Sequence, residues 1–291
     1  MANIRDLRLR ITSVGNIQKI TGAMEMVATT KLRRFQTVAV EAKPYTEGIE
    51  ELIRGLSATV DSDPSAAGDS APLFANGVEG KPLGILFVGS DRGLCGAYNS
   101  MVGKRLDAAI AGLQGEYALY VVGRKAMAHA ERMGYPVTQY LEDFNLEKMT
   151  FAEAASISSM LVAEFRKGNL SGVSVCFTRF VSMMRYVPEI GSFLPIAEDS
   201  SEVVSEAADV ILEPSAPKVM GSIVPRYLET RIYHALLESI TSEYASRRFA
   251  MTNATEAAGD MKTEITREYN RARQQKITSE ILEIVSGAEA L

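Results

Sequence analysis

The residues with the clearest potential for chemistry form a glycine-containing loop from Ser90 to Asn99, with the sequence Ser-Asp-Arg-Gly-Leu-Cys-Gly-Ala-Tyr-Asn. The loop follows an apolar run and opens a helical pattern, which is the position of phosphate-binding loops in α/β proteins. Its spacing fits neither GxGxxG nor GxxxxGKS, and the next apolar run ends in Gly123-Arg124 rather than in a ribose-binding acid. We therefore interpret the loop as a structural turn, with a nucleotide site as the alternative.

The other reactive side chains do not form a catalytic set. His129 and His234 lie in helical patterns without a metal-ligand partner three or four residues away, so we interpret both as surface or helix-packing residues. Cys95 stands at a helix N-terminus, where a thiolate is favoured, but the sequence pattern places no histidine near it and a packed small residue is the preferred interpretation. We expect no catalytic residue, no metal and no cofactor in this chain.

The composition argues against several classes of protein. Of the 291 residues, 46% are hydrophobic and 23% are charged, which is typical of a chain that buries a sizeable core. The net charge of −5 argues against a nucleic-acid binder that relies on summed positive charge. The two cysteines, Cys95 and Cys176, are far apart, so we expect a reducing compartment. No stretch approaches the ~20 apolar residues that span a bilayer, so we expect a chain that is neither exported nor membrane-spanning.

Two long helical patterns must position these residues. Apolar side chains recur every three or four residues from Ile4 to Leu56, which predicts an N-terminal helix over residues 1–60 with a kink at Pro44. A second pattern predicts a C-terminal helix over residues 218–286. Its seam repeats every seven residues, at Met251, Ala258, Ile265 and Ala272. Neither rod can bury its apolar face alone, so we expect them to pair as a long antiparallel coiled coil.

An α/β domain is predicted between the two rods, at residues 82–197. Short continuous apolar runs predict buried strands at Leu83–Val88, Tyr117–Val122 and Val173–Phe180. Helical patterns alternate with them at Tyr98–Leu113, Arg124–Met133 and Phe151–Lys167. This alternation predicts a Rossmann-like, doubly wound and mostly parallel sheet. We expect linkers at residues 61–81, which are rich in Ser, Ala, Gly, Asp and Pro and should be exposed, and at residues 198–217.

Clusters of basic and polar residues mark both rods. Lys31, Arg33 and Arg34 lie on the N-terminal helix, and Arg271, Arg273, Gln274 and Lys276 lie on the C-terminal helix. Such clusters are usually solvated faces. Here they belong to a rod too thin to cover its own apolar seam, so a surrounding partner is an equally good interpretation.

Three collinear motifs resemble the γ subunits of F-type ATP synthases. The segments are Ile20–Arg34 (Ile-Thr-Gly-Ala-Met-Glu-Met-Val-Ala-Thr-Thr-Lys-Leu-Arg-Arg), the Ser90–Asn99 loop and Arg273–Ala288 (Arg-Gln-Gln-Lys-Ile-Thr-Ser-Glu-Ile-Leu-Glu-Ile-Val-Ser-Gly-Ala). The similarity covers essentially the full chain, in the family's order. Gly22 departs from the family, which commonly carries lysine there, and the redox-regulatory cysteine insertion of plastid members is absent, which favours a bacterial type.

The resemblance implies a non-catalytic shaft that turns inside an α3β3 ring of alpha and beta subunits. The α/β domain would sit on the epsilon subunit and the membrane c-ring, so that proton or sodium flow turns the shaft while ATP chemistry stays in the beta subunits. The complex would lie at the cytoplasmic face of the cell membrane, with this chain peripheral. The implied contacts to the β catch loop and along the shaft are Met24, Arg247, Arg273, Gln274, Thr278 and Glu280.

Two alternatives come from other classes of protein. The first is an NAD(P)-type or phosphate-handling α/β enzyme with a coiled-coil dimerisation arm, against which the absent nucleotide fingerprints count. The second is a purely structural coiled-coil scaffold. Recovery of an ATPase α/β complex with the purified chain distinguishes both from a rotor subunit.

Overall fold

The computed structural model describes residues 4–62, 64–196, 213 and 215–289. Its longest elements are helix α1 (Ile4–Ser62) and helix α5 (Ala216–Glu289), with a five-stranded sheet between them in the sequence. The chain forms two compact units: Met1–Thr30 with Arg247–Leu291, and Lys31–Ser246. Both long helices contribute to both units, and each unit is described separately below.

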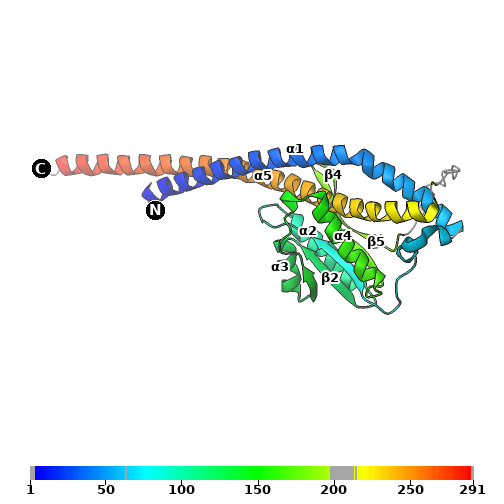
Figure 1. Cartoon of the computed structure of the whole chain (residues 1–291). Coiled ribbons are helices and arrows are strands. Elements are labelled where there is room, and N and C mark those ends of the chain that lie inside the picture. The colour runs from blue at the N-terminus through cyan, green and yellow to red at the C-terminus, as the bar shows by residue number, and fades with distance from the viewer. Residues whose placement is uncertain (1–3, 63, 197–212, 214, 290–291) are drawn as a thin grey trace. The chain divides into compact units, whose positions relative to one another are not determined.

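The second unit contains the sheet, of which β2, β4 and β5 are labelled in Figure 1. The strand order of this sheet is β3-β2-β1-β4-β5. Its strands are β1 (Leu83–Val88), β2 (Tyr117–Val122), β3 (Val137–Tyr140), β4 (Gly172–Ser182) and β5 (Arg185–Leu194). The first four are mutually parallel, and β5 pairs antiparallel with β4. The helices of this region are α2 (Tyr98–Ala111), α3 (Arg124–Met133) and α4 (Phe151–Arg166). The predicted Rossmann-like, mostly parallel sheet is confirmed.

The core explains why the central strands are continuous apolar runs. Ile85, Phe87 and Leu119 are buried on one face of the sheet, where side chains of α2 and α3 cover them. Leu86 and Val88 alternate with these residues along β1 and are buried as well. A strand covered on both faces has no solvent side for polar residues, so the sequence loses its alternation.

Two strands and one helical segment differ from the sequence-based expectation. β3 has only four residues with little burial, and β5 contains Pro188 and Gly191, so neither forms an apolar run. The 3₁₀ helix η1 (Pro64–Leu73) occupies part of the expected linker 61–81. The expectation of an exposed linker is wrong there, because Ala67 and Leu73 are buried. Small residues permit close packing as readily as they permit exposure, and composition does not separate the two.

The remaining features of the long helices are the start of α5 and two internal prolines. Most of the expected linker 198–217 lies outside the described residues, and α5 begins at Ala216. Pro44 lies inside α1 without ending it, and Pro225 lies inside the first turns of α5. A proline removes one backbone hydrogen bond from a helix, and the other backbone hydrogen bonds of each helix continue past it.

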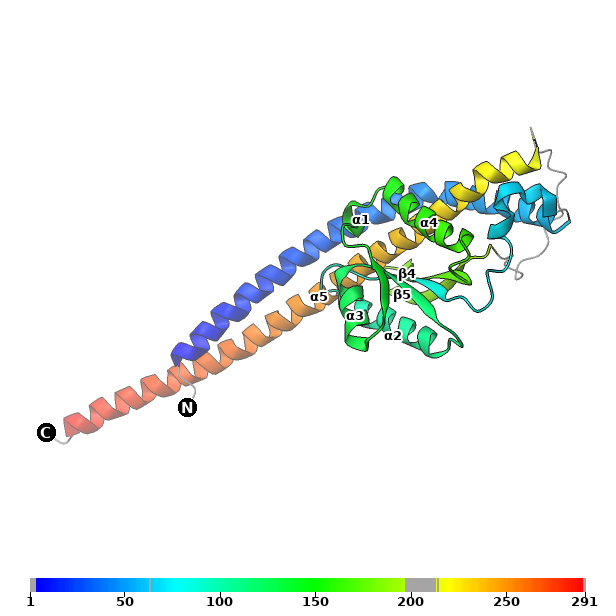
Figure 2. The same ribbon diagram turned by 60° about the horizontal axis from the view of Figure 1, so that its bottom comes forward.

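The first unit is an antiparallel helix pair, as the heptad pattern predicted. Figures 1 and 2 show the N-terminal part of α1 running beside α5. Leu7 and Val14 of α1 pack with Ala258 and Ile265 of α5 to form its core. Met251, also on the predicted seam, is buried. The seam therefore consists of the residues that the seven-residue repeat singled out.

Candidate partner-binding site

The register of the helix pair fixes where the pairing ends. The Thr255 hydroxyl donates to Thr21 Oγ1 at 2.8 Å, and the Thr252 hydroxyl donates to the Glu25 carboxylate at 2.8 Å. Residue numbers thus rise on α1 as they fall on α5. Continued to the first described residue, the same register places Ile4 level with Arg273. From Arg273 onward α5 extends past the described part of α1.

Two glycines face the partner helix near the middle of the pair. A Cβ atom added at Gly259 would lie 2.9 Å from Gln18 Nε2, the end of a flexible side chain that can move aside. A Cβ atom at Gly22 would lie 3.8 Å from Thr255 Cγ2, which is an ordinary van der Waals distance. Gly22 is therefore not required by the packing of α1 on α5, and a larger residue's first carbon fits there.

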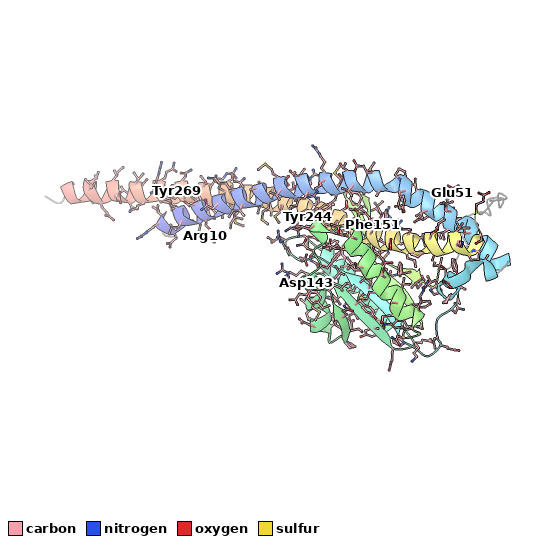
Figure 3. All side chains as sticks on the ribbon, in the orientation of Figure 1. Arg10, Glu51, Asp143, Phe151, Tyr244 and Tyr269 are labelled. Atoms are coloured by element: carbon pink, nitrogen blue, oxygen red, sulfur yellow. The ribbon has the colours of Figure 1, made fainter. Side chains whose placement is uncertain are left out.

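Every residue in the C-terminal segment 273–286 of α5 is exposed, and this segment is called the tip here. The seam stops at Ala272, because its next two seven-residue steps are the exposed serines Ser279 and Ser286. Figure 3 shows α5 continuing beyond Tyr269 and past the described start of α1, with side chains projecting from its ribbon. The tip therefore has no partner within the described residues.

A second apolar surface begins on the tip where the seam ends. It consists of Ile277, Ile281, Ile284 and Val285, called the apolar stripe here. At about 100° per residue, the three isoleucines lie roughly 120–180° around the helix from Ala272. They are strongly exposed, and Ile284 reaches 72%. An apolar stripe on a new face of an unpaired helix is typical of a surface that meets another chain.

Four of the six predicted contact residues border this stripe. On the same projection, Arg273 lies beside the edge of the stripe formed by Ile284, Gln274 lies between Ile281 and Val285, and both polar residues are exposed. The Thr278 hydroxyl donates to the Gln274 carbonyl at 3.0 Å, and Glu280 forms an ion pair with Lys276 at 3.6 Å. The guanidinium of Arg273 is thus positioned beside apolar side chains at the surface, where it can fork onto a carboxylate.

The other two predicted residues lie elsewhere on the pair. Met24 is half-buried, and the register places it level with Asn253, roughly 30 Å along the axis from Arg273 at 1.5 Å per residue. Arg247 is only 6% exposed, so little of its side chain is available to a partner. The predicted contacts therefore divide into a cluster on the tip and two residues far from it.

The Ser90–Asn99 loop has the geometry of a turn that satisfies its own polar groups. The Ser90 amide donates to Asn99 Oδ1 at 3.2 Å, and the Asn99 amide donates to Cys95 Sγ at 3.1 Å. The Ser246 hydroxyl on α5 donates to the Cys95 carbonyl at 2.7 Å. Leu94 and Gly96 have positive φ angles, which give the chain its sharp turn. These contacts support the structural interpretation of the loop.

His129 and Cys176 are used in packing. His129 is buried, its Nε2 lies 2.8 Å from Asp107 Oδ1 and its ring meets Phe87 edge-on. The helix-packing interpretation of His129 is confirmed. Burial raises the pKa of the Cys176 thiol to about 12, which leaves it protonated at neutral pH. Among the described residues, no group of three or more His, Cys, Asp or Glu side chains is placed to hold a metal ion.

One polar cluster in the second unit escaped sequence reasoning. Glu147, on the short 3₁₀ helix η2 (Leu146–Lys148), contacts Lys31 of α1 and Tyr244 of α5. Lys31 stood out as part of a basic cluster, but its acidic partner is 116 residues away. No local pattern signals such a pair, because only the fold brings the two residues together.

Comparisons with known proteins agree along the whole chain. The family model described as ATP synthase matches residues 3–291. The ATP synthase gamma chain of Moorella thermoacetica is 38% identical over 291 residues, with both chains covered completely. The ATP synthase gamma chain of Mycobacterium marinum is 38% identical over 306 residues, which cover 100% of this chain and 98% of the relative.

Solved structures with similar folds come from mitochondrial ATP synthases. A chain of the Euglena gracilis enzyme, in a structure titled OSCP/F1/c-ring, gives a TM-score of 0.63 at 18% identity and covers 99% of this chain and 94% of its own length. A chain of the Tetrahymena thermophila enzyme, from its central stalk and c-ring, gives 0.57 at 22% identity and covers 81% and 99%. Among the described residues, no helix combines the length and the apolar content needed to cross a membrane.

Proposed function

Because the chain belongs to the ATP synthase gamma-chain family, we propose that it is the central rotor shaft that couples ion-driven rotation of a c-ring to ATP synthesis and hydrolysis in beta subunits. The observation that carries this proposal is the tip of α5. A helix end that stops pairing and turns an apolar stripe outward requires an external partner. An α3β3 ring of alpha and beta subunits that encloses the tip supplies one.

The division of labour follows from the chemistry of the chain. Its signature loop is occupied by internal hydrogen bonds, so we assign the ATP chemistry to the beta subunits and treat this chain as non-catalytic. The α/β unit would rest on the epsilon subunit and the membrane c-ring. The similar mitochondrial structures described above contain a central stalk, an F1 part and a c-ring. We place the chain peripherally at the cytoplasmic face of the cell membrane, held there by these partners.

Coupling requires that the shaft present different faces to the three beta subunits. The tip is asymmetric, because its apolar stripe covers one side and the polar positions Lys276, Ser279 and Glu283 lie on the other. Each rotational position therefore offers a beta subunit a different surface. A partner conformation that fits one face better is favoured at that angle, which is a mechanical shift of populations.

Arg273 and Gln274 would form the polar part of the contact with the β catch loop. The arginine fork can bind a carboxylate with two parallel hydrogen bonds, and the neighbouring apolar stripe partly excludes water from that contact. A charge-assisted hydrogen bond of this kind is worth about 1.5–3 kcal/mol. Loss of these hydrogen bonds should weaken the contact between the shaft and the beta subunit. It should leave the helix intact, because both side chains are exposed.

The test is the double variant Arg273→Ala with Gln274→Ala in the assembled complex. We expect near-normal assembly, with severalfold changes in ATPase activity and in ATP-driven ion pumping. The matched control is Gln275→Ala with Lys276→Ala, which also removes one amide and one cation but lies farther around the helix. Wild-type activity of the first double variant, or equal effects of the two, would show that the catch assignment is wrong. Failure of the wild-type chain to assemble with alpha and beta subunits would refute the rotor proposal itself.

A further inference from the structure

A single carboxylate joins three separate elements of the second unit. Lys31 Nζ lies 2.5 Å from Glu147 Oε2, and the Tyr244 hydroxyl donates to Glu147 Oε1. Lys31 Nζ also donates to the Tyr244 hydroxyl oxygen at 3.1 Å. The three side chains thus form a closed triangle of contacts. Its corners come from α1, from η2 and from α5, so every side of the triangle connects parts of the chain that are distant in sequence.

The aromatic corner of the triangle is fixed by packing. Tyr244 is only 3% exposed, and its ring stacks on Phe35 of α1 with centroids 5.6 Å apart. The Lys31 ammonium also lies 5.4 Å from the centre of the Tyr244 ring. The tyrosine hydroxyl therefore has little freedom to turn away from the carboxylate. The contact is preorganised on the side of the two long helices.

The carboxylate corner is equally constrained. Leu146, next to Glu147, is buried in the core, and the Asn145 side chain accepts a hydrogen bond from the Glu147 amide at 2.9 Å. Three residues after Glu147, Thr150 caps α4 through a reciprocal capping box with Glu153. η2 is thus fixed by the burial of its own Leu146 and by the capped start of α4 that follows it. The position of Glu147 is set by the α/β region rather than by the long helices.

The cluster keeps Glu147 ionised. Burial alone would raise the pKa of this carboxyl, but hydrogen bonds from Lys31 and Tyr244, together with the charges of Lys31 and Arg92, lower it below its usual range. Arg92, on the signature loop, lies 3.9 Å from Glu147 Oε1 and is the most exposed member. A carboxylate at neutral pH therefore meets one close ammonium and one guanidinium farther away.

We propose that Glu147 is the positioning residue that locks the α/β region to α1 and α5, so that torque passes between them without slip; this inference rests on the rotor function proposed above. Apolar contacts have no preferred direction and permit sliding along a helix. A hydrogen-bonded ion pair has a fixed geometry and resists displacement. Glu147 contacts both long helices from one position in the α/β region. The triangle therefore resists displacement of either helix relative to that region.

The test is Glu147→Gln in the assembled, membrane-bound complex, with Glu142→Gln as the matched control. Glu142 lies in the same connection and is exposed, so its substitution makes the same change of charge outside the triangle. For Glu147→Gln we expect the equilibrium ratio of slipped to locked arrangements to rise about threefold, the factor that a partly exposed ion pair carries, so that fewer coupling ions are pumped per ATP hydrolysed than in the wild type. Glu142→Gln should couple like the wild type. Full coupling in Glu147→Gln, or an equal loss in both, would overturn the proposal.

Exchanging the charges of Lys31 and Glu147 tests whether loss of their ion pair, and not disruption of the fold, causes the loss of coupling. Lys31→Glu combined with Glu147→Lys rebuilds the ion pair with reversed signs but places the new lysine near Arg92, so we expect it to recover part of the coupling that either single change loses. If Glu147→Gln does not assemble, the swap must restore assembly and coupling together, and failure to do so overturns the proposal. Hydrogen exchange of the amides in α4 shows whether each variant keeps the local fold. A wild-type chain that does not assemble refutes the rotor function and not this inference alone.

Discussion

The sheet of the second unit and the tip of α5 in the first unit contain the same kinds of apolar residue and treat them in opposite ways. In β1, Ile85, Leu86 and Phe87 are all fully buried. On the tip, Ile277, Ile281 and Ile284 are all exposed. The difference lies in what surrounds each element, because the sheet has cover on both faces whereas the tip has none within the described residues.

This contrast teaches where the free energy of each region comes from. The sheet is stabilised by burial inside the chain, at about 25 cal/mol per Å² of apolar surface. The tip gains little from burial, so its helix depends on local propensity and on continuity with the paired part of α5. On the rotor function proposed above, a partner subunit would cover these isoleucines.

The most direct test makes the same substitution in both regions. Leu119→Ala, in β2, removes a fully buried side chain and should lower the free energy of unfolding by about 3–4 kcal/mol. Leu282→Ala, on the tip, changes a side chain that is 60% exposed and should alter it by less than about 0.5 kcal/mol, because alanine is a better helix former. Urea unfolding of the isolated chain, followed by hydrogen exchange of the sheet amides, gives both values. Similar losses from the two variants would mean that the tip is not an open surface.

A second prediction concerns the pH dependence of stability caused by Glu238, on the part of α5 that belongs to the second unit. Burial raises the pKa of Glu238 from its ordinary 4.5 to about 7, and Glu189 adds to this effect while Arg179 opposes it. Because the pKa is higher in the folded chain, the stabilising effect of this group is complete below its unfolded pKa and is lost as the pH rises through 7. Glu238→Gln removes that loss. The free energy of unfolding of the variant, measured relative to the wild type, should therefore rise by about 2–3 kcal/mol between pH 5 and pH 8.

The control for this prediction is the neighbouring histidine. His234 Nδ1 lies 4.0 Å from Glu238 Oε1, and burial lowers its pKa, so its own contribution to stability is lost as the pH falls. Repeating the comparison in a His234→Gln background removes that opposite trend. A stability difference between Glu238→Gln and its parent that stays constant from pH 5 to pH 8 would contradict the assignment.

The smallest effect is expected on the tip. Glu280→Gln breaks an ion pair with Lys276 in which both side chains are more than half exposed. Solvated pairs four residues apart on a helix contribute about 0.3–0.5 kcal/mol, and salt screens them. We expect a change of that size in the helicity or stability of the isolated chain at low salt and none at high salt. A larger effect that persists at high salt would show that the tip is packed against something in the free chain.

Periodicity predicted the parts of the fold that follow from local sequence. The seven-residue seam through Met251, Ala258 and Ile265 identified the contact face of α5, and the apolar runs identified β1 and β2. These features are legible because a buried face imposes its own period on the sequence. β5 was missed because it carries Pro188 and Gly191 on an edge strand, where such residues are tolerated.

The candidate site divides in the same way. The tip residues Arg273, Gln274, Thr278 and Glu280 came from motif resemblance, and their contact with a beta subunit remains a prediction. Helical geometry adds that the first two border the apolar stripe. The Glu147 triangle could not be predicted, since no spacing in the sequence relates residues 31, 147 and 244. Only the three-dimensional fold brings such residues into contact.

The pairing of α1 with α5 also sets the order of events during synthesis on the ribosome. Thr21 meets Thr255, a partner 234 residues further along the chain. At roughly 5–20 residues per second, the first helix waits on the order of 10–50 seconds for the segment that covers Leu7 and Val14. The strands of the sheet meet earlier, because their partners are translated between these two segments. The nascent chain therefore carries an uncovered apolar helix for most of its translation, and chaperones that bind exposed apolar segments should find it there.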